Sequence, residues 1–431
     1  MKKILILTQL IPALFLLQSC TQKQVEIKWS YSNTDVIETA NTLMPDSVEI
    51  YLFLDATTSM KGFVSNPTSV YNTLLDEFER SAQAGWKTVK IRFFKFGTRF
   101  KEIDRNQFRQ AKTQKFYEEP GIYEKTNIDS VVKFIGSNYA TSQLYVIITD
   151  LFQSEADINI VTASIKESCF SKGISIGILG VKSDFEGMVF DAKVPPYYFK
   201  SKIGDLSTYR NLFLLIFGST SEIKHLIESL SSASYVDKSY FILISNKIVQ
   251  NFTTNMTKVK TETGVSPKSV KRELNLYNFN VKDKTTLIQL QAEIQFRMLP
   301  YSPQVNLSGI NIIAYRKIAT SKDIPKDSTL SSDVFLKNVE GQNDYFKAII
   351  EINLPEPKVT YSSYLIYFYP SINNGFILPD WITEFSSDNP NPKKDQNKTL
   401  NFDRFVYDLM RANSAVNQPK IAKVYLNFNR I

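Results

Sequence analysis

Five side chains with hard oxygen donors occupy positions from which a folded chain could gather them. The segment DATTSMKG (55–62) begins directly after the apolar run VEIYLFL (48–54) and supplies a carboxylate and hydroxyls. A further hydroxyl directly precedes NIDSVVKFIG (127–136), and a second carboxylate follows the apolar run QLYVIIT (143–149). Such a donor set suits a small hard divalent cation held partly through water, with room for a ligand from outside. The candidate metal ligands are Asp55, Thr57, Ser59, Thr126 and Asp150.

Each of these residues also has an ordinary structural explanation. Asp, Ser and Thr are common turn residues, so the pattern from Asp55 to Ser59 is weak evidence by itself. Thr126 could equally be the N-cap of the helix that follows it. A shared site is favoured because the three elements occur in order, each at the end of a predicted strand or the start of a predicted helix.

The segments around these positions predict an α/β domain. Apolar runs typical of buried strands alternate with amphipathic helical segments, which indicates a doubly wound, mostly parallel sheet. The expected strands are 48–54, 89–97, 143–149, 174–181 and 211–218, and the expected helices are 67–82, 127–136 and 221–230. The stretch 183–208 interrupts the alternation, and we expect an excursion such as a hairpin there in place of a crossover helix. Ligands of open parallel sheets bind at the carboxyl ends of the strands, where Asp55 and Asp150 fall.

Residues 46–235 resemble the von Willebrand factor A family. The family motif D-x-S-x-S corresponds to Asp55-x-Thr57-x-Ser59, and its later Thr and Asp correspond to Thr126 and Asp150. The resemblance implies a metal-ion-dependent adhesion site for Mg²⁺, or for Mn²⁺ or Ca²⁺. It implies direct coordination by Thr57 and Ser59, water-mediated roles for Asp55 and Asp150, and either role for Thr126. The last coordination position would take a carboxylate from a partner protein, which makes the site a recognition device.

The chain departs from the family pattern at several positions. Thr57 replaces the commoner Ser, which keeps the oxygen and adds a methyl group. Glu124 and Lys125 stand where the family often has glycines. Leu151 stands where glycine is common, so the loop is less free to adopt a positive φ. We expect these changes to weaken metal binding without abolishing it.

The second half of the chain has a different periodicity. Four segments alternate apolar and polar residues with period two and no helix between them, which predicts a smaller antiparallel β-sandwich-like domain with an immunoglobulin-like candidate topology. These segments are 287–296, 309–318, 345–354 and 363–370. The expected organisation is a signal peptide at 1–19, a tether at 20–47, a von Willebrand A-like domain at 48–235, a linker at 236–264, a β-sandwich-like domain at 265–380 and a C-terminal extension of loop, helix and strand at 381–431.

The beginning of the sequence predicts the location of the protein. A short basic start and an apolar stretch lead into Leu17-Gln18-Ser19-Cys20, which resembles a bacterial lipobox. The resemblance implies cleavage before Cys20 and lipidation of its thiol and new amino group; the alternative is a plain signal peptide with an incidental cysteine. The residues after Cys20 carry no acidic cluster of the kind that marks surface export. We therefore expect a lipid-anchored envelope protein that faces the periplasm, with the cell surface as the alternative.

Several activities are disfavoured by the composition. His225 is the only histidine, and Cys169 is the only cysteine besides Cys20, so zinc sites and Ser-His-Asp or Cys-His catalysis are not expected. The net charge of +8 contains no basic block, which disfavours nucleic-acid binding. We expect a non-enzymatic protein that binds a protein partner, and the alternative is a metal-independent structural or envelope-assembly scaffold. An enzyme with an unrecognised carboxylate pair is the least favoured hypothesis.

Overall fold

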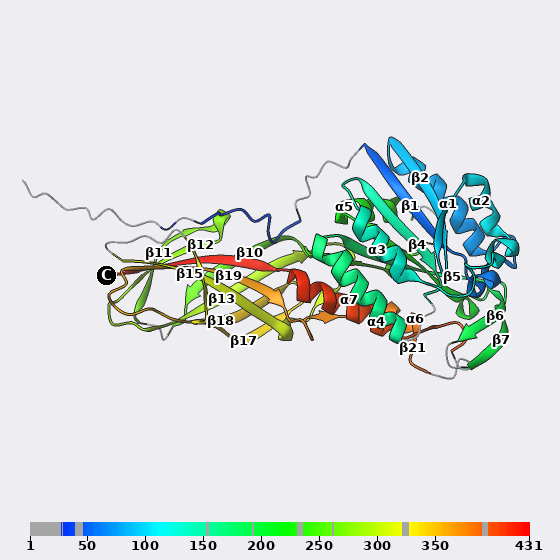
Figure 1. Ribbon diagram of the computed structural model, residues 1–431. Coiled ribbons are helices and arrows are strands. Elements are labelled where there is room, and N and C mark those ends of the chain that lie inside the picture. The colour runs from blue at the N-terminus through cyan, green and yellow to red at the C-terminus, as the bar shows by residue number, and fades with distance from the viewer. Residues whose placement is uncertain are drawn as a thin grey trace, which may run out of the picture.

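The protein consists of an α/β part and a β-rich part that lie end to end (Figure 1). The computed structural model describes residues 27, 29–38, 46–151, 155–191, 194–230, 236–260, 263–320, 327–389 and 395–431. The expected signal peptide and Cys20 fall outside the described residues. Within those ranges, no helix combines the length and apolar character that a membrane crossing requires.

A seven-stranded sheet forms the centre of the α/β part. Its strands, in order across the sheet, are β3 (Phe100–Ile103), β2 (Thr88–Phe96), β1 (Ser47–Asp55), β4 (Gln143–Thr149), β8 (Arg210–Gly218), β5 (Ser175–Ser183) and β9 (Phe241–Ile244). β1 runs parallel to both β2 and β4. The expectation of a mostly parallel sheet is therefore met only by the neighbouring strands β2, β1 and β4. The strands β3, β8 and β9 are antiparallel to their neighbours.

The antiparallel placement of β8 follows from the connection that precedes it. Among the described residues between β5 and β8 there is no α-helix; a hairpin of β6 (Glu186–Asp191) and β7 (Val194–Lys200) takes the place of a crossover helix. A parallel neighbour requires a long crossover, whereas a strand that returns directly pairs antiparallel. The stretch 183–208 therefore contains the hairpin that its irregular pattern suggested.

Helices cover both faces of this sheet. Alternate β1 residues point to opposite faces, so that Leu52 belongs to one core and Phe53 to the other. The first core includes α1 (Val70–Gly85) and α5 (Thr220–Leu230). The second includes α3 (Ile128–Asn138), α4 (Glu155–Ser168) and α7 (Phe402–Asn417). The described helices also include the short α2 (Arg105–Arg109) and α6 (Asp380–Phe385), and a 3₁₀ helix, η1 (Thr58–Val64), follows β1.

Two sheets form the β-rich part and share one hydrophobic core. The antiparallel four-stranded sheet has the order β10 (Val249–Lys258), β13 (Leu287–Met298), β18 (Tyr345–Asn353) and β17 (Val334–Gln342). The mixed six-stranded sheet has the order β11 (Val265–Lys271), β12 (Leu276–Val281), β23 (Ala422–Arg430), β19 (Tyr361–Pro370), β15 (Ile310–Ala319) and β16 (Thr329–Ser331). Two short pairs are β14 (Gln304–Val305) with β20 (Phe376–Ile377), and β21 (Ser386–Ser387) with β22 (Thr399–Leu400).

The observed boundaries differ from the expected ones. The expected linker 236–264 contains β9, an edge strand of the α/β sheet, and β10, a strand of the β-rich part. The expected extension 381–431 supplies α7 to the α/β core and β23 to the middle of the six-stranded sheet. Local periodicity identified the helix and the strand of the extension but not β9 and β10, and it carries no information about which distant sheet an element joins. The chain therefore passes between the two parts more than once, which ties them together.

Candidate oxygen-donor site at the carboxyl ends of β1 and β4

The structure gathers the predicted oxygen donors at one edge of the α/β sheet. Asp55 is the last residue of β1, and Thr57 and Ser59 lie in the turn that leads into and begins η1. Asp150 directly follows β4, which neighbours β1. Thr126 stands two residues before α3, and its hydroxyl reaches the residues after β1. The parallel pairing of β1 and β4 brings together residues that are far apart in sequence.

Asp55 is the centre of the hydrogen-bond network at this site, and its side chain is fully buried. Its Oδ1 accepts hydrogen bonds from the backbone N–H of Thr57 at 3.0 Å and from the Thr57 hydroxyl at 2.6 Å. Its Oδ2 accepts a hydrogen bond from the Thr149 hydroxyl at 2.7 Å. The carboxylate is therefore held on both of its oxygens by its own turn and by the neighbouring strand.

The hydroxyl oxygens cluster around Thr57. Thr57 Oγ1 lies 3.2 Å from Ser59 Oγ and 3.1 Å from Thr126 Oγ1. Because the one Thr57 proton is directed to Asp55, the lone pairs of Thr57 Oγ1 are left on the side of the other hydroxyls. Neighbouring ligands of an octahedral Mg²⁺ with bonds of 2.0–2.1 Å are about 2.9 Å apart. The spacing of these oxygens is close to that value.

The electrostatics of Asp55 disfavour its bare negative charge. Burial, and then the negative charge of Asp150, raise the pKa of the Asp55 carboxyl to about 7. A buried carboxylate beside a second carboxylate is stabilised by a positive charge placed between them. A divalent cation would supply that charge, and the hydroxyls would complete its oxygen shell. The chemistry of the donor set therefore fits a small hard cation.

Backbone contacts fix the loops that carry these side chains. The Ala56 N–H donates to the Phe96 carbonyl at 2.7 Å, and the Asn127 N–H donates to the Gly97 carbonyl at 3.1 Å. Gly97 has no room for a side chain, because a Cβ there would lie 1.9 Å from the Ile122 carbonyl oxygen. The end of β2 and the turn after it thus bind the backbone next to Asp55 and the backbone next to Thr126. A glycine is required at position 97 because the chain at Ile122 passes so close to it.

Glu124, Lys125 and Leu151, which differ from the von Willebrand A motif, each have local contacts or a local conformation that explains their place. Glu124 accepts a hydrogen bond from the Gly121 N–H at 2.7 Å, so it organises its own loop. The Lys125 ammonium lies 3.8 Å from Asp157 Oδ1, and its side chain is 67% exposed, so an ion pair with α4 holds its charge in solvent. Leu151 adopts φ = 51°, the left-handed conformation that glycine adopts most easily. None of the three removes an oxygen donor from the cluster.

Thr149 is a positioning residue that the candidate set omitted. Besides donating to Asp55, its hydroxyl accepts a hydrogen bond from the Leu151 N–H at 3.2 Å. It therefore connects the end of β1 to the turn that follows β4. The available sequence signal was a threonine directly after the apolar run from Leu144 to Ile148, and the structure shows that it is fully buried.

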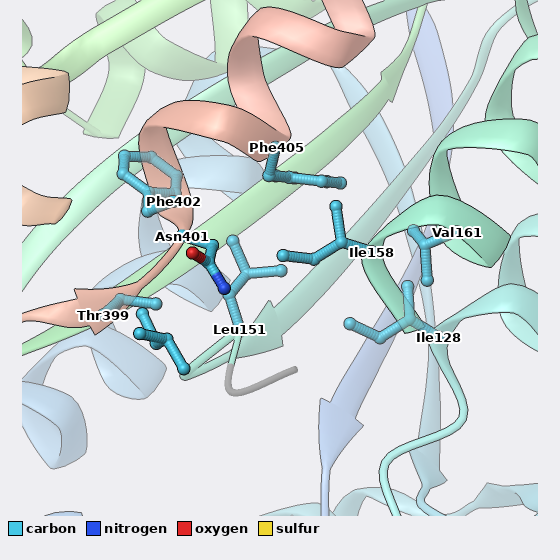
Figure 2. Close-up of a pocket in the computed structure, with 9 residues that line it drawn as sticks. Ile128, Leu151, Ile158, Val161, Thr399, Asn401, Phe402 and Phe405 are labelled. Atoms are coloured by element: carbon cyan, nitrogen blue, oxygen red, sulfur yellow. The ribbon is translucent and has the colours of Figure 1, made fainter. Parts of the chain in front are cut away.

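An apolar pocket lies beside this site. Figure 2 shows Leu151 between Asn401 and Ile158, with Phe402 and Phe405 of α7 above them. Its lining is completed by Ile128, Val161, Thr399 and Leu400. The pocket joins the residue after Asp150 to the C-terminal helix, so α7 forms part of the support of the site.

The two residues with potential for catalysis do not take part in this site. His225 Nε2 contacts the Gly85 carbonyl, and its ring packs edge-on against Trp86. Cys169 is fully buried, and burial raises the pKa of its thiol to about 12. A thiol in this state is a packing group, because the reactive form is the thiolate.

Similarity to known proteins does not assign the site. No family model, no curated protein and no solved structure matches the chain. Within the described residues, no group of three or more His, Cys, Asp or Glu side chains is placed to hold a metal ion. The candidate site has two carboxylates and depends on hydroxyl donors for the rest of its ligands.

Proposed function

We propose that the protein is a lipid-anchored envelope protein that captures a carboxylate of a protein partner through a divalent metal ion. The observation that carries this proposal is the cluster around Thr57 Oγ1, which lies within 3.2 Å of Asp55, Ser59 and Thr126. Asp55, Thr57 and Ser59 share one turn, but Thr126 lies 69 positions from Thr57 in the sequence, so local turn formation does not account for its approach. Mg²⁺ suits the donor set best, and Mn²⁺ or Ca²⁺ would use the same oxygens.

The residues would divide the work by their position. Thr57 and Ser59 would bind the ion through their hydroxyls, and Thr126 directly or through water. Asp55 and Asp150 would neutralise its charge and orient the shell, mostly through water. The bound ion would supply a coordination position for a carboxylate from outside. Ser59 and Thr126 are only partly buried, which leaves the cluster accessible from that side.

The von Willebrand A type of fold is the best account of the α/β part. In its favour are the order β3, β2, β1 and β4, the helices on both faces, and the donors at the carboxyl ends of β1 and β4. The antiparallel β8 is a difference from a doubly wound parallel sheet. For the β-rich part we propose a β-sandwich-like domain, because its two sheets share one core.

Titration calorimetry with Mg²⁺ and Mn²⁺ tests the metal site directly. The wild-type protein should show saturable binding, and Asp55→Ala should show none. Asp184→Asn is a matched control, because Asp184 is a buried acid of the same part that bonds Asn66 and the Val70 N–H away from the site. If the wild type gives the same null response as Asp55→Ala, the metal site is refuted.

A metal-independent scaffold is the second candidate. It is favoured by the hydrogen bonds from Thr57 and Thr149, which already satisfy Asp55 without an ion. The two candidates differ in their response to a chelator. Chelation should abolish partner capture by the metal-dependent protein and leave capture by a scaffold intact.

The location of the protein is part of the proposal. We propose cleavage before Cys20 and a lipid anchor on that residue, facing the periplasm, with the cell surface as the alternative. Mass spectrometry of the mature N-terminus tests this. A diacylglyceryl-modified Cys20 supports the anchor, and an unmodified N-terminus at any other residue refutes it.

A further inference from the structure

The β-rich part has one end that is furthest from the α/β part. At this end β10 finishes at Lys258, β13 begins at Leu287, and β18 finishes at Asn353, which pairs with Leu287. In the other sheet, Val281 of β12 pairs with Arg430 of β23. The Arg430 guanidinium joins the two sheets there by donating to the Asp283 and Pro355 carbonyls. We call this the distal end; it comprises residues 258–260, 281–287, 353–360 and 429–430.

The N-terminal segment enters the structure at the distal end. Ile27 is buried with Ala319 and Tyr361, which are paired where β15 finishes and β19 begins. Residues 29–38 then run towards the α/β part, where Ile37 bridges to Val249 at the start of β10 (Figure 1).

Polar contacts fix the segment along this path. The Trp29 indole N–H donates to Ser363 Oγ at 2.7 Å, and the Tyr425 hydroxyl donates to the Ser30 carbonyl at 2.8 Å. The direction of the chain at its point of entry is therefore set by the structure.

The length of the preceding chain places its anchor close by. Cys20 stands seven positions before Ile27 in the sequence. Seven residues span at most about 25 Å when fully extended. A lipid on Cys20 would therefore hold the distal end, and no other end of the molecule, next to the membrane surface.

The charges of the distal end suit an anionic surface. Six basic residues stand in the segments that define it, against two acids, Asp283 and Glu356, and Glu356 is paired with Lys358 at 2.7 Å. Leu287, an exposed apolar residue, lies among them. Basic groups near anionic lipids add to the hold of a single lipid anchor. The basic residues are Lys258, Lys260, Lys282, Lys284, Lys358 and Arg430.

We infer that the distal end lies against an anionic lipid surface, so that the β-rich part acts as a stalk and the oxygen-donor site faces away from the membrane. The carboxyl end of β1 points away from the β-rich part, and η1 packs against the β6–β7 hairpin at the opposite extreme of the molecule (Figure 1). The proposed orientation depends on the lipid anchor of the proposed function, whereas the basic charge of the distal end does not depend on that anchor.

Vesicle binding by the full mature chain without its lipid tests the surface itself. Cys20→Ser should bind vesicles of phosphatidylcholine mixed with phosphatidylglycerol at least about tenfold more tightly than pure phosphatidylcholine at low salt. Reversing the charge of Lys260, Lys282 and Lys284 to Glu should remove this preference. The matched control reverses Lys115, Lys133 and Lys166, which are exposed on the α/β part. Equal binding to both vesicles, or an equal loss in the control, overturns the inference.

The orientation is tested on the lipidated chain. A fluorophore on Lys284→Cys should be quenched by a headgroup-labelled lipid, and a fluorophore on Lys115→Cys, near η1, should not be. The buried Cys169 leaves the labelling specific. Equal quenching of the two positions refutes a stalk. Both measurements are made with a chelator present. The result is therefore the same whether or not the oxygen-donor site binds a metal ion, and a negative result does not bear on metal binding.

Discussion

The Thr149 hydroxyl donates a 2.7 Å hydrogen bond to Asp55 Oδ2, across the pairing of β4 with β1. Both residues are fully buried, and each is the last residue of its strand. The bond fixes the orientation of a carboxylate whose other oxygen is held by Thr57. The strand ends of the sheet are thus joined by side chains as well as by the backbone ladder.

Thr149→Val should therefore weaken both metal binding and the fold. The loss of the two hydrogen bonds of the Thr149 hydroxyl, to Asp55 and from the Leu151 N–H, should lower the free energy of unfolding by about 2 kcal/mol, while Asp55 keeps its bonds from Thr57. The affinity for Mn²⁺ should fall by about tenfold, as is typical when a residue that orients a ligand is removed. Calorimetry and urea unfolding measure the two effects. Thr149→Ser restores the donor, and if it binds Mn²⁺ no better than Thr149→Val, the positioning role is wrong.

Asp55 should make the metal-free protein less stable as the pH rises. Its pKa is raised in the folded state to about 7, from an ordinary value of 3.8, by burial and by Asp150. The folded state then binds the proton more tightly than the unfolded state, so stability from this group is lost between about pH 4 and pH 7. In a chelator, Asp55→Asn should have the higher free energy of unfolding at pH 8, by about 1 kcal/mol or more.

The wild type and Asp55→Asn should respond differently to Mg²⁺. The ion should stabilise the wild type at pH 8 and leave Asp55→Asn unchanged, because binding to the folded state alone raises its stability. Urea unfolding of both proteins at pH 5 and pH 8, with and without Mg²⁺, measures the free energies of unfolding that this comparison needs. A wild-type advantage over Asp55→Asn at pH 8 in the chelator would show that burial does not penalise this carboxylate.

The sequence predicted those features of the fold that depend on local patterns of apolar and polar residues. The apolar runs ending at Leu54 and Thr149 are strands, and the alternating run from Leu290 to Phe296 has its apolar residues buried as expected. The partnership of β23 with β12 and β19 was not predictable, because strand pairing depends on contacts between distant residues. The role of Thr149 was missed for a related reason. A hydroxyl in an apolar strand indicates that a hydrogen-bond partner exists, but the sequence does not show that the partner is Asp55.

Leu151→Gly tests whether the unusual backbone at the turn after β4 limits the protein. The substitution should relieve the left-handed conformation, worth about 1 kcal/mol. It should also remove a buried side chain from the pocket it shares with Ile158 and Phe405, which costs about 3 kcal/mol. We expect a net loss of about 2 kcal/mol in the free energy of unfolding, with Mn²⁺ affinity changed less than about threefold.

Leu151→Ala separates these two effects. It keeps the backbone strain and loses most of the packing, so it should be less stable than Leu151→Gly by the strain energy alone. Urea unfolding of both variants gives the comparison. If Leu151→Gly is more stable than the wild type, the backbone strain outweighs the packing and glycine would be the better residue here.

The ion pair between Asp35 and Lys423 should control the attachment of the N-terminal segment. Their charged atoms are 2.6 Å apart, and the Lys423 side chain is 1% exposed. Burial tends to raise the pKa of Asp35, but hydrogen bonds from Lys423 and Tyr367 outweigh it and hold the pKa below its usual value. The contribution of Asp35 is therefore present above about pH 4 and lost as the pH falls below it.

Asp35→Ala should lower the free energy of unfolding by about 2 kcal/mol, because it leaves the Lys423 ammonium buried without its carboxylate. This is below the usual loss for a fully buried pair, since Asp35 is itself 35% exposed. Adding Lys423→Met should recover part of the loss, because no buried charge then remains. The protection factors of residues 29–38 against hydrogen exchange should fall in Asp35→Ala, and in the wild type at pH 3. If exchange in that segment is unchanged while global stability falls, the pair stabilises β23 and does not hold the segment.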